Sequence, residues 1–329
     1  MSVGAATLAG LKAVARRPSL VALLLAFNLL AAALLAVPLV GVLEDGLQHS
    51  DAAGQMLYGF DYAWWTAWHT GKSDWTASFQ PDLFGAGFAV KNVDLLLRGS
   101  LPGRAFESLE DSWNDFPAPP LVLGLGLAYM LLQVFLGGGV LAVLRGGQAG
   151  LPWRGLFHGA GFYFGRLLRV AALALLADWV LFRLNGPFAA WAEGRAREAV
   201  SEDTALVWLF GRHALLLLGI LAVHLLSCYA KLIVVLEERR SALLAFLSAI
   251  GFCFRNLRRA FGHLLAVALL GVLLVALWSV LDGAWHTTGY KTQLVSLALS
   301  QALVFGLIGL RLSLYAGQIA LYRALPKGP

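Results

Sequence analysis

Six apolar stretches set the pattern of hydrophobic and polar positions along this chain. They cover residues 19–43, 121–144, 170–184, 214–236, 260–281 and 294–322. A helix of about 20 residues crosses the hydrocarbon core of a bilayer, and the short third stretch reaches that length with the apolar residues before it. Because a helix satisfies its backbone groups internally in lipid, the pattern predicts an all-α fold: a polytopic transmembrane helix bundle with six spans.

A nine-residue segment that precedes the third span recurs before the fifth. Gly161–Arg169 reads GFYFGRLLR and Gly251–Arg259 reads GFCFRNLRR, and both run directly into apolar residues. Basic residues among aromatic and apolar ones are typical of a helix that lies on the membrane surface. The recurrence predicts that residues 121–184 and 214–281 are two helical hairpins related as a parallel internal repeat, each with a surface-lying amphipathic helix on the cytoplasmic side.

The polar segments differ in their share of Lys and Arg. Residues 44–120 hold four basic residues against eleven acidic ones, whereas residues 1–18, 145–169 and 237–259 are rich in Lys and Arg. Because short basic loops remain in the cytoplasm, we expect both termini inside the cell. Segment 44–120 and the loop at 185–213 are then outside, and residues 1–18 form an amphipathic cytoplasmic N-terminus.

The long outer segment is also rich in tryptophan. Its indole side chains are Trp64, Trp65, Trp68, Trp75 and Trp113. Indoles favour the headgroup level, where the ring is in apolar surroundings and its N–H meets water. Together with an amphipathic pattern over 88–101, they predict a cap folded onto the outer leaflet. Residues 282–329 complete the chain as a short outer turn, the sixth span and a cytoplasmic C-terminus.

Composition excludes a soluble globular protein. Hydrophobic residues make up 59% of the chain, charged residues only 13%, and the mean hydropathy is +0.72, whereas a soluble surface needs far more charge. The net charge of +6 follows from basic residues at the cytoplasmic face, so it does not indicate nucleic acid as a partner. The two cysteines, Cys228 and Cys253, lie outside the long outer loop, so that loop has no disulfide framework.

Part of the chain resembles a known group of proteins. The residues that carry this resemblance are Tyr229, Ala230, Lys231, Glu237, Arg239, Arg240, Ser241 and Ala242, with the outer segments 60–65, 79–81 and 85–87. They are similar to a family of uncharacterised bacterial multi-pass membrane proteins, and the resemblance implies a location in the cytoplasmic (inner) membrane of a bacterium. The order of a basic start, one span, a large outer loop and five further spans resembles permease subunits of ABC-2-type exporters.

Ionisable residues within the spans are the candidates for a substrate or proton path, because burying them in lipid is costly. Asp178 and His224 each lie about ten residues into their spans, near the bilayer centre, and could form a pair between neighbouring helices. Arg311 and Lys231 lie about 27 Å along their spans from the outer side, at a depth where long side chains reach the inner headgroups. We select Asp178, His224 and Arg311 as the candidates for a substrate or proton path, and structural roles remain open for these three and for Lys231. Asn28 and Gln133 are expected to make hydrogen bonds between helices.

The two repeated segments contain five arginines that are candidate ligands for anionic lipid headgroups: Arg166, Arg169, Arg255, Arg258 and Arg259. The outer-loop residues His49, Asp51, Asp61 and His69 match no established metal-ligand spacing. The sequence also contains no nucleophile elbow and no phosphate-binding glycine loop. We therefore expect no metal, no cofactor and no enzymatic activity.

Two function classes are compatible with this pattern. The first is a transport-type protein or a permease-like subunit, with a second membrane protein or an ATPase as partner. The second is a non-catalytic structural or accessory membrane protein that organises a protein partner or anionic lipid through its outer cap and its basic inner helices. If activity depends on Asp178, the first class is favoured. If replacement of Asp178 has no effect, the second class is favoured.

Overall fold

The computed structural model describes residues 1–48, 50–56, 61–70, 76, 120–146, 152–284 and 290–326. Throughout these residues the regular secondary structure is helical, so the all-α prediction is confirmed for them. In chain order the helices are α1 (Val3–Ala15), α2 (Pro18–Leu47), α3 (Ala52–Gln55), α4 (Tyr62–His69), α7 (Pro120–Gly146), α8 (Pro152–Arg197), α9 (Glu202–Leu236), α10 (Ala242–Arg255), α11 (Leu257–Gly283) and α12 (Tyr290–Ala324).

Four helices of the described residues are long and apolar enough to cross a membrane. They comprise Gly124–Gly146 of α7, Glu202–Leu236 of α9, Leu257–Gly283 of α11 and Lys291–Ala324 of α12. A fifth span results if α1 and the first part of α2, which meet at a bend of 77°, count as one unit. These helices are compatible with a helical membrane bundle of four to five spans.

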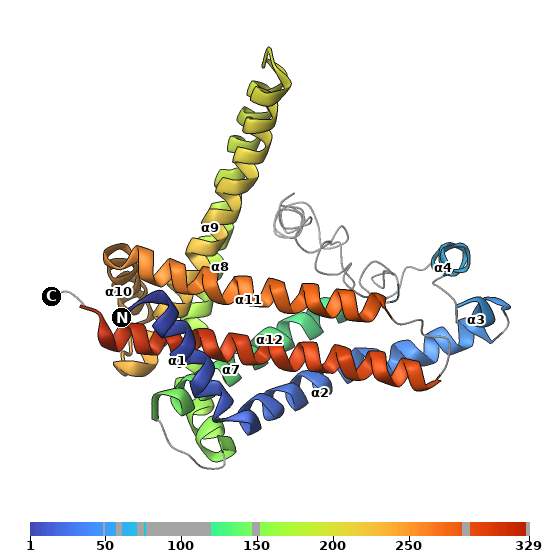
Figure 1. The fold of residues 1–329 in the computed structure, drawn as a ribbon, viewed down its shortest axis with the longest axis horizontal. Helices are drawn as coiled ribbons and strands as arrows, with labels where there is room; N and C mark the ends of the chain where they lie inside the picture. Colours follow the sequence, from blue (N-terminus) through green and yellow to red (C-terminus); the bar gives the residue numbers. More distant parts are fainter. Residues whose placement is uncertain are drawn as a thin grey trace.

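The long helices form two arms that meet at one end of the molecule (Figure 1). Helices α2, α7, α11 and α12 run roughly alongside one another in the first arm. Helices α8 and α9 pack against each other as a hairpin that projects away from them. The arms join near α1, α10 and both chain termini, so the molecule is open between its arms and closed at this junction.

Glycines bring α7 and α8 into close contact at the junction. A Cβ on Gly139 would lie 2.2 Å from the Leu156 carbonyl oxygen, and one on Gly159 would lie 2.4 Å from the Ala142 Cβ. Such distances leave no room for any side chain at Gly139 or Gly159, so the two helices approach closely there. In the same helix Gly126 has nothing within 4 Å of its Cβ position, so not every glycine of α7 serves packing.

Helix α1 packs onto α12 and α11 through its buried face, Ala6, Gly10 and Val14. A Cβ on Gly10 would lie 2.2 Å from the Ser313 carbonyl oxygen. The amphipathic N-terminus thus buries one face against protein. Across the α1–α11 contact, the Thr7 hydroxyl is 3.0 Å from His263 Nδ1, while His263 Nε2 is 3.2 Å from the Leu314 carbonyl oxygen.

The segment 185–213, expected as an outer loop, is helical except for residues 198–201. Helix α8 continues through Pro187 to Arg197, and α9 starts at Glu202 after the Ser201 hydroxyl accepts a hydrogen bond from the Thr204 N–H. The two helices are joined here by an Arg212–Glu193 ion pair, whose hydrogen bond lowers the pKa of the Glu193 carboxyl. This ion pair holds the polar ends of α8 and α9 together, so the two helices continue beyond their apolar parts. The hydropathy pattern of one segment does not predict such a contact with another segment.

Arginine side chains hold the helix ends together at the junction. Arg145 Nη1 donates to the Val235 carbonyl oxygen, one of the last carbonyls of α9, at 2.8 Å and lies 2.8 Å from Glu238 Oε1. Arg323 Nη2 donates to the Arg145 carbonyl oxygen at the end of α7. The final carbonyls of a helix lack partners within it and carry partial negative charge, so these guanidinium groups stabilise the ends of α7 and α9.

The two copies of the repeated segment differ in structure. Gly161–Arg169 lies within the continuous helix α8, whereas Gly251–Arg259 includes the break at Asn256 between α10 and α11. Phe162 and Phe252, which the repeat aligns, are 52% and 2% exposed. The second surface helix also begins earlier than expected, at Ala242. The internal repeat stays a prediction, since similar residues here occupy different surroundings.

Part of the Trp-rich cap lies within the described residues. In α4 the rings of Trp64 and Trp68 stack with centroids 5.5 Å apart, and the Asp61 carboxylate caps the helix by accepting from the Ala63 and Trp64 N–H groups. Trp75, Trp113 and the amphipathic segment 88–101 lie outside the described residues. The placement of the cap on a membrane surface stays a prediction.

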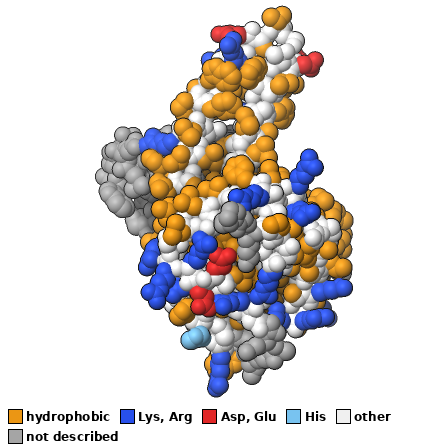
Figure 2. Space-filling model, turned by 90° about the vertical axis from the view of Figure 1, so that its left-hand side faces the viewer, with side chains coloured by type: hydrophobic (Ala, Val, Ile, Leu, Met, Phe, Trp, Pro, Cys, Tyr) orange, Lys and Arg blue, Asp and Glu red, His pale blue; other side chains and the backbone are white. Residues whose placement is uncertain are grey.

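The junction end of the molecule is rich in basic side chains. Figure 2 shows Lys and Arg side chains spread over this face, with few acidic ones between them. The exposed arginines of α10 and α11 belong to this end, namely Arg255, Arg258 and Arg259. Basic residues and both termini therefore lie together at one end of the molecule.

Candidate functional site

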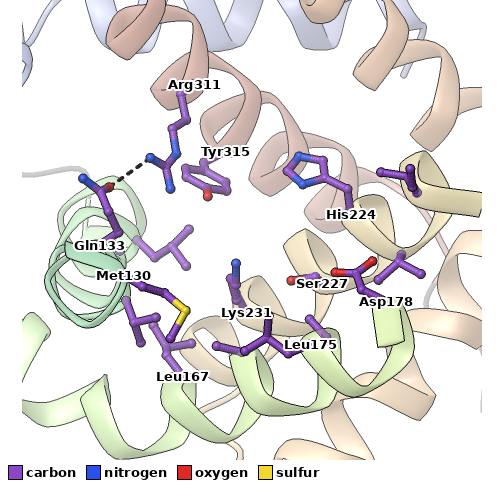
Figure 3. A pocket seen from close by; sticks show the side chains of 17 residues that line it. Met130, Gln133, Leu167, Leu175, Asp178, His224, Ser227, Lys231, Arg311 and Tyr315 are labelled. Carbon is purple, nitrogen blue, oxygen red and sulfur yellow. Dashed lines mark hydrogen bonds between the residues drawn. The ribbon is translucent and has the colours of Figure 1, made fainter. Parts of the chain in front are cut away.

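A cavity of about 330 Å³ lies among α7, α8, α9 and α12, where the hairpin diverges from the first arm (Figure 3). Its walls combine apolar side chains with polar groups from all four helices. The polar lining residues are Gln133, Asp178, His224, Ser227, Lys231, Arg311 and Tyr315. Ligand cavities of proteins show the same combination, a mostly apolar wall with a few convergent polar groups.

Asp178 of α8 and His224 of α9 lie close together on one side of this cavity (Figure 3). Their charges are near enough to interact electrostatically. One helical turn from His224 is Cys228, whose Sγ lies 3.6 Å from His224 Nε2. The carboxylate of Asp178 thus has a titratable imidazole beside it, so this pair could exchange or hold a proton at the cavity wall.

Arg311 of α12 occupies the opposite side and is tied to α7. Its Nη1 donates to Gln133 Oε1 at 3.0 Å. Gln133 Nε2 and the Tyr129 hydroxyl in turn donate to Asn28 Oδ1 of α2, at 3.4 and 2.5 Å. The hydrogen bonds expected between helices for Asn28 and Gln133 are therefore present, and they fix the position of the Arg311 guanidinium at the cavity wall.

Lys231 of α9 contributes a second cation to the cavity (Figure 3). Both Lys231 and Arg311 interact electrostatically with His224, so the positive groups act on the same space. Within the part of the chain that the structure describes, the Lys231 ammonium has no hydrogen bond or ion pair. An ammonium without a partner in a cavity with mostly apolar walls is costly, so an anion in the cavity would stabilise it.

Comparison with protein-family models, with curated proteins and with solved structures finds no match to this chain or its fold. The geometry of the cavity is therefore the basis for a functional conclusion. That geometry is defined by the four helices around the cavity and by the polar groups that they bring into it.

The structure places Asp178, His224 and Arg311, the three residues chosen from the sequence, in this single cavity. Asp178 is turned toward the space between helices, on the same side as His224 (Figure 3). Arg183 of the same helix lies over the Trp179 ring, with its guanidinium carbon 5.7 Å from the ring centroid. A role of these three residues in carrying a substrate or a proton stays a prediction.

The five arginines predicted to bind lipid headgroups fall into two groups. Arg166 is engaged within the protein: its Nη1 donates to the Glu238 carbonyl oxygen at 3.2 Å, and its guanidinium lies 4.8 Å from the Phe162 ring centroid. The remaining four are exposed, namely Arg169, Arg255, Arg258 and Arg259. These four side chains are accessible to headgroups, whereas Arg166 also stabilises the turn after α9 through its hydrogen bond to the Glu238 carbonyl oxygen.

Sequence reasoning missed Ser227, Lys231 and Tyr315 as cavity residues. Lys231 was placed near the inner headgroups by its depth, and depth alone does not tell which face of α9 carries it. The signal available was its helical spacing from His224 and Ser227, at i+7 and i+4, which puts all three on one face. Among the described residues no group of three His, Cys, Asp or Glu side chains could hold a metal ion.

Proposed function

We propose that this chain is a transport-type integral membrane protein whose substrate path runs through the cavity. The observation that carries this proposal is the convergence of Asp178, His224, Lys231 and Arg311 on one cavity. Of the four helices around it, α7, α9 and α12 are candidate spans, and α8 packs against α7 and α9. Ionisable residues in spans are rare and costly, and they typically mark paths for substrates, ions or protons.

Packing alone gives a poor account of these four residues. A charged residue near the bilayer centre, the depth predicted for Asp178, costs about 3 kcal/mol even on the lenient insertion scale. A helix that needed only packing contacts would carry leucine or alanine there, as its neighbours Leu176 and Ala177 do. Retaining four ionisable groups around one cavity is the pattern expected when the cavity takes a polar ligand.

The cavity is expected to be reachable from water. A cysteine introduced by Val223→Cys, on the cavity wall of α9, should react with a membrane-impermeant thiol reagent in intact cells or sealed vesicles. A thiol in contact with water ionises and reacts, whereas one covered by lipid stays protonated and inert. We expect labelling at least tenfold faster than that of the parent protein, whose Cys228 and Cys253 are buried.

Leu269→Cys is the matched control for this measurement. Leu269 is 60% exposed on α11 and is not part of the cavity wall, so hydrocarbon would cover it in a membrane. Labelling of Leu269→Cys at the rate of Val223→Cys would show that the helices are not embedded as proposed. If Val223→Cys stays unlabelled from both sides, the transport proposal fails.

The orientation we propose has six spans with both termini inside the cell, in the inner membrane of a bacterium. It is supported by the basic face at the junction (Figure 2) and by the rule that basic residues remain cytoplasmic. The turn between α8 and α9 is then outside. In intact cells we expect labelling of Ala199→Cys and protection of Arg240→Cys, both measured with the same impermeant reagent. The opposite result would show that the molecule has the inverted orientation in the membrane.

A second candidate function is an accessory protein that organises anionic lipid at the inner leaflet. It is favoured by α10, which exposes Leu243, Leu244, Leu247 and Phe254 beside basic residues. A helix with an exposed apolar face and flanking arginines suits the membrane interface. The labelling of Val223→Cys separates the two functions, because an accessory role needs no path from water into the bundle.

A further inference from the structure

The charges around the cavity are not balanced. Asp178 is the carboxylate of the lining, and it lies beside His224 (Figure 3). Lys231 and Arg311 are the permanent cations, and they come from α9 and α12. Even with a neutral imidazole, the lining carries one positive charge more than it carries negative charge, so the cavity favours an anion.

The donors of the two cations are available to such an anion. Among the described residues, the Arg311 guanidinium donates to Gln133 through Nη1 and also interacts with the Tyr315 hydroxyl, which leaves further N–H donors for a ligand. A guanidinium has five N–H donors in a planar fork that fits a carboxylate or phosphate. The Lys231 ammonium adds three more donors. The two side chains reach the cavity from different helices, so they can hold one anionic group from two directions.

The other walls of the cavity are apolar. Helix α8 contributes Leu167, Ala171, Ala174 and Leu175, and helix α9 contributes Ile220 and Val223. Leu175 is 48% exposed although it lines the cavity. An uncovered apolar wall next to two cations fits a ligand that has an anionic end and an apolar chain.

We propose that the cavity binds an anionic amphiphile, a carboxylate or phosphate group attached to an apolar chain. The anionic group is held by Lys231 and Arg311, and the chain lies along the Leu167–Leu175 face of α8. This inference rests on the proposed function and names its substrate class. A volume of about 330 Å³ is near the lower limit for ligand cavities, so the end of a long chain extends into the opening between the arms.

Two other ligand classes fit less well. A small inorganic anion would use the cations but leave the apolar wall exposed to water. An uncharged lipid would cover that wall but leave the Lys231 ammonium without a counter-charge. The amphiphile satisfies both parts of the cavity, and each part can be tested by removing one half of the ligand.

The test uses the purified full-length protein in mild detergent, with cis-parinarate, a fluorescent single-chain carboxylate, as the bound probe. Displacement is measured with oleate, with oleyl alcohol of the same chain length, with dioleoyl phosphatidic acid and with inorganic phosphate. We expect oleate or phosphatidic acid to displace the probe at a tenfold or more lower concentration than oleyl alcohol. The relative strength of these two anions tells a single-chain substrate from a membrane phospholipid. Inorganic phosphate should displace nothing.

Variants assign the binding to the cavity. Lys231→Gln should weaken probe binding about tenfold, and Lys231→Arg should restore most of it. Lys12→Gln is the matched control, since Lys12 is exposed on α1 and lies outside the cavity, and it should bind as the parent does. Because Lys231 lacks partners among the described residues, its replacement should not lower the thermal unfolding midpoint.

Several results would overturn the inference. These are equal displacement by oleate and oleyl alcohol, displacement by inorganic phosphate alone, or full binding by Lys231→Gln. If Val223→Cys is labelled from water and these amphiphiles show no charge preference, the proposed function stands and the substrate class is wrong. If Val223→Cys is inert and no probe binds, both proposals fail.

Discussion

Replacing Gly139 by alanine is expected to destabilise the protein by about 3 kcal/mol, the upper part of the range for overpacking a filled interior. The added methyl group would lie 2.2 Å from the Leu156 carbonyl oxygen, an atom of helix backbone that cannot rotate away. Helices α7 and α8 would have to separate, and the buried contacts of Leu156 and Leu167 would be weakened. The measurement is the free energy of unfolding in mixed micelles titrated with a denaturing detergent.

Gly126→Ala provides the control on the same helix. Nothing lies within 4 Å of a Cβ at Gly126, so its replacement should change stability by less than about 1 kcal/mol, the helix-propensity difference between the two residues. Equal effects of the two substitutions would mean that α7 and α8 do not approach closely at Gly139. A large loss for Gly139→Ala alone would show that this glycine is there for packing.

The second large effect is expected at the junction, where Arg145→Gln should cost about 2 kcal/mol. The guanidinium supports the end of α9 through the Val235 carbonyl, pairs with Glu238 and reaches the Tyr163 hydroxyl at 3.1 Å. Hydrogen bonds to charged groups contribute about 1.5–3 kcal/mol each when buried. Here the Arg145 side chain is 34% exposed and that of Glu238 is 56% exposed, so solvent screening reduces the sum.

Arg240→Gln is the control for this prediction, because Arg240 is exposed in the same turn. It should alter the free energy of unfolding by no more than about 0.5 kcal/mol. A double-mutant cycle with Glu238→Gln isolates the ion pair. Additive effects of Arg145→Gln and Glu238→Gln would contradict the pairing, even if each substitution destabilised the protein by itself.

Part of the candidate site could be predicted from the sequence. Asp178 interrupts an apolar run, and a carboxylate at that depth must turn toward protein or water because of its solvation cost. The same reasoning selected His224. The partners of these residues could not be predicted, because contacts between α8, α9 and α12 join positions far apart in the chain. Lys231 shows the limit, since its depth gave a plausible position at the headgroups and only the packing of α9 turned it into the cavity.

The repeated segment shows a different limit. Gly161–Arg169 and Gly251–Arg259 share aromatic, leucine and arginine positions, and a shared pattern predicts a shared structure. In the structure Arg166 stays within an unbroken helix, while the aligned Asn256 stands at a helix break and its side chain donates to the Phe252 carbonyl oxygen. Such a side-chain bond offers the backbone an alternative to continued helix.

The sequence by itself determined that the chain is helical and apolar, because long runs of apolar residues have few other ways to satisfy their backbone groups in lipid. It also determined which ionisable residues are unusual for their depth in the predicted spans. Only the tertiary structure decided that α8 and α9 leave the bundle as a hairpin, that Gly139 rather than Gly126 sits against a neighbouring backbone, and that four ionisable residues meet in one cavity. The physical reason is that the period of a helix fixes which residues share a face, whereas the partner of that face depends on contacts distant in sequence.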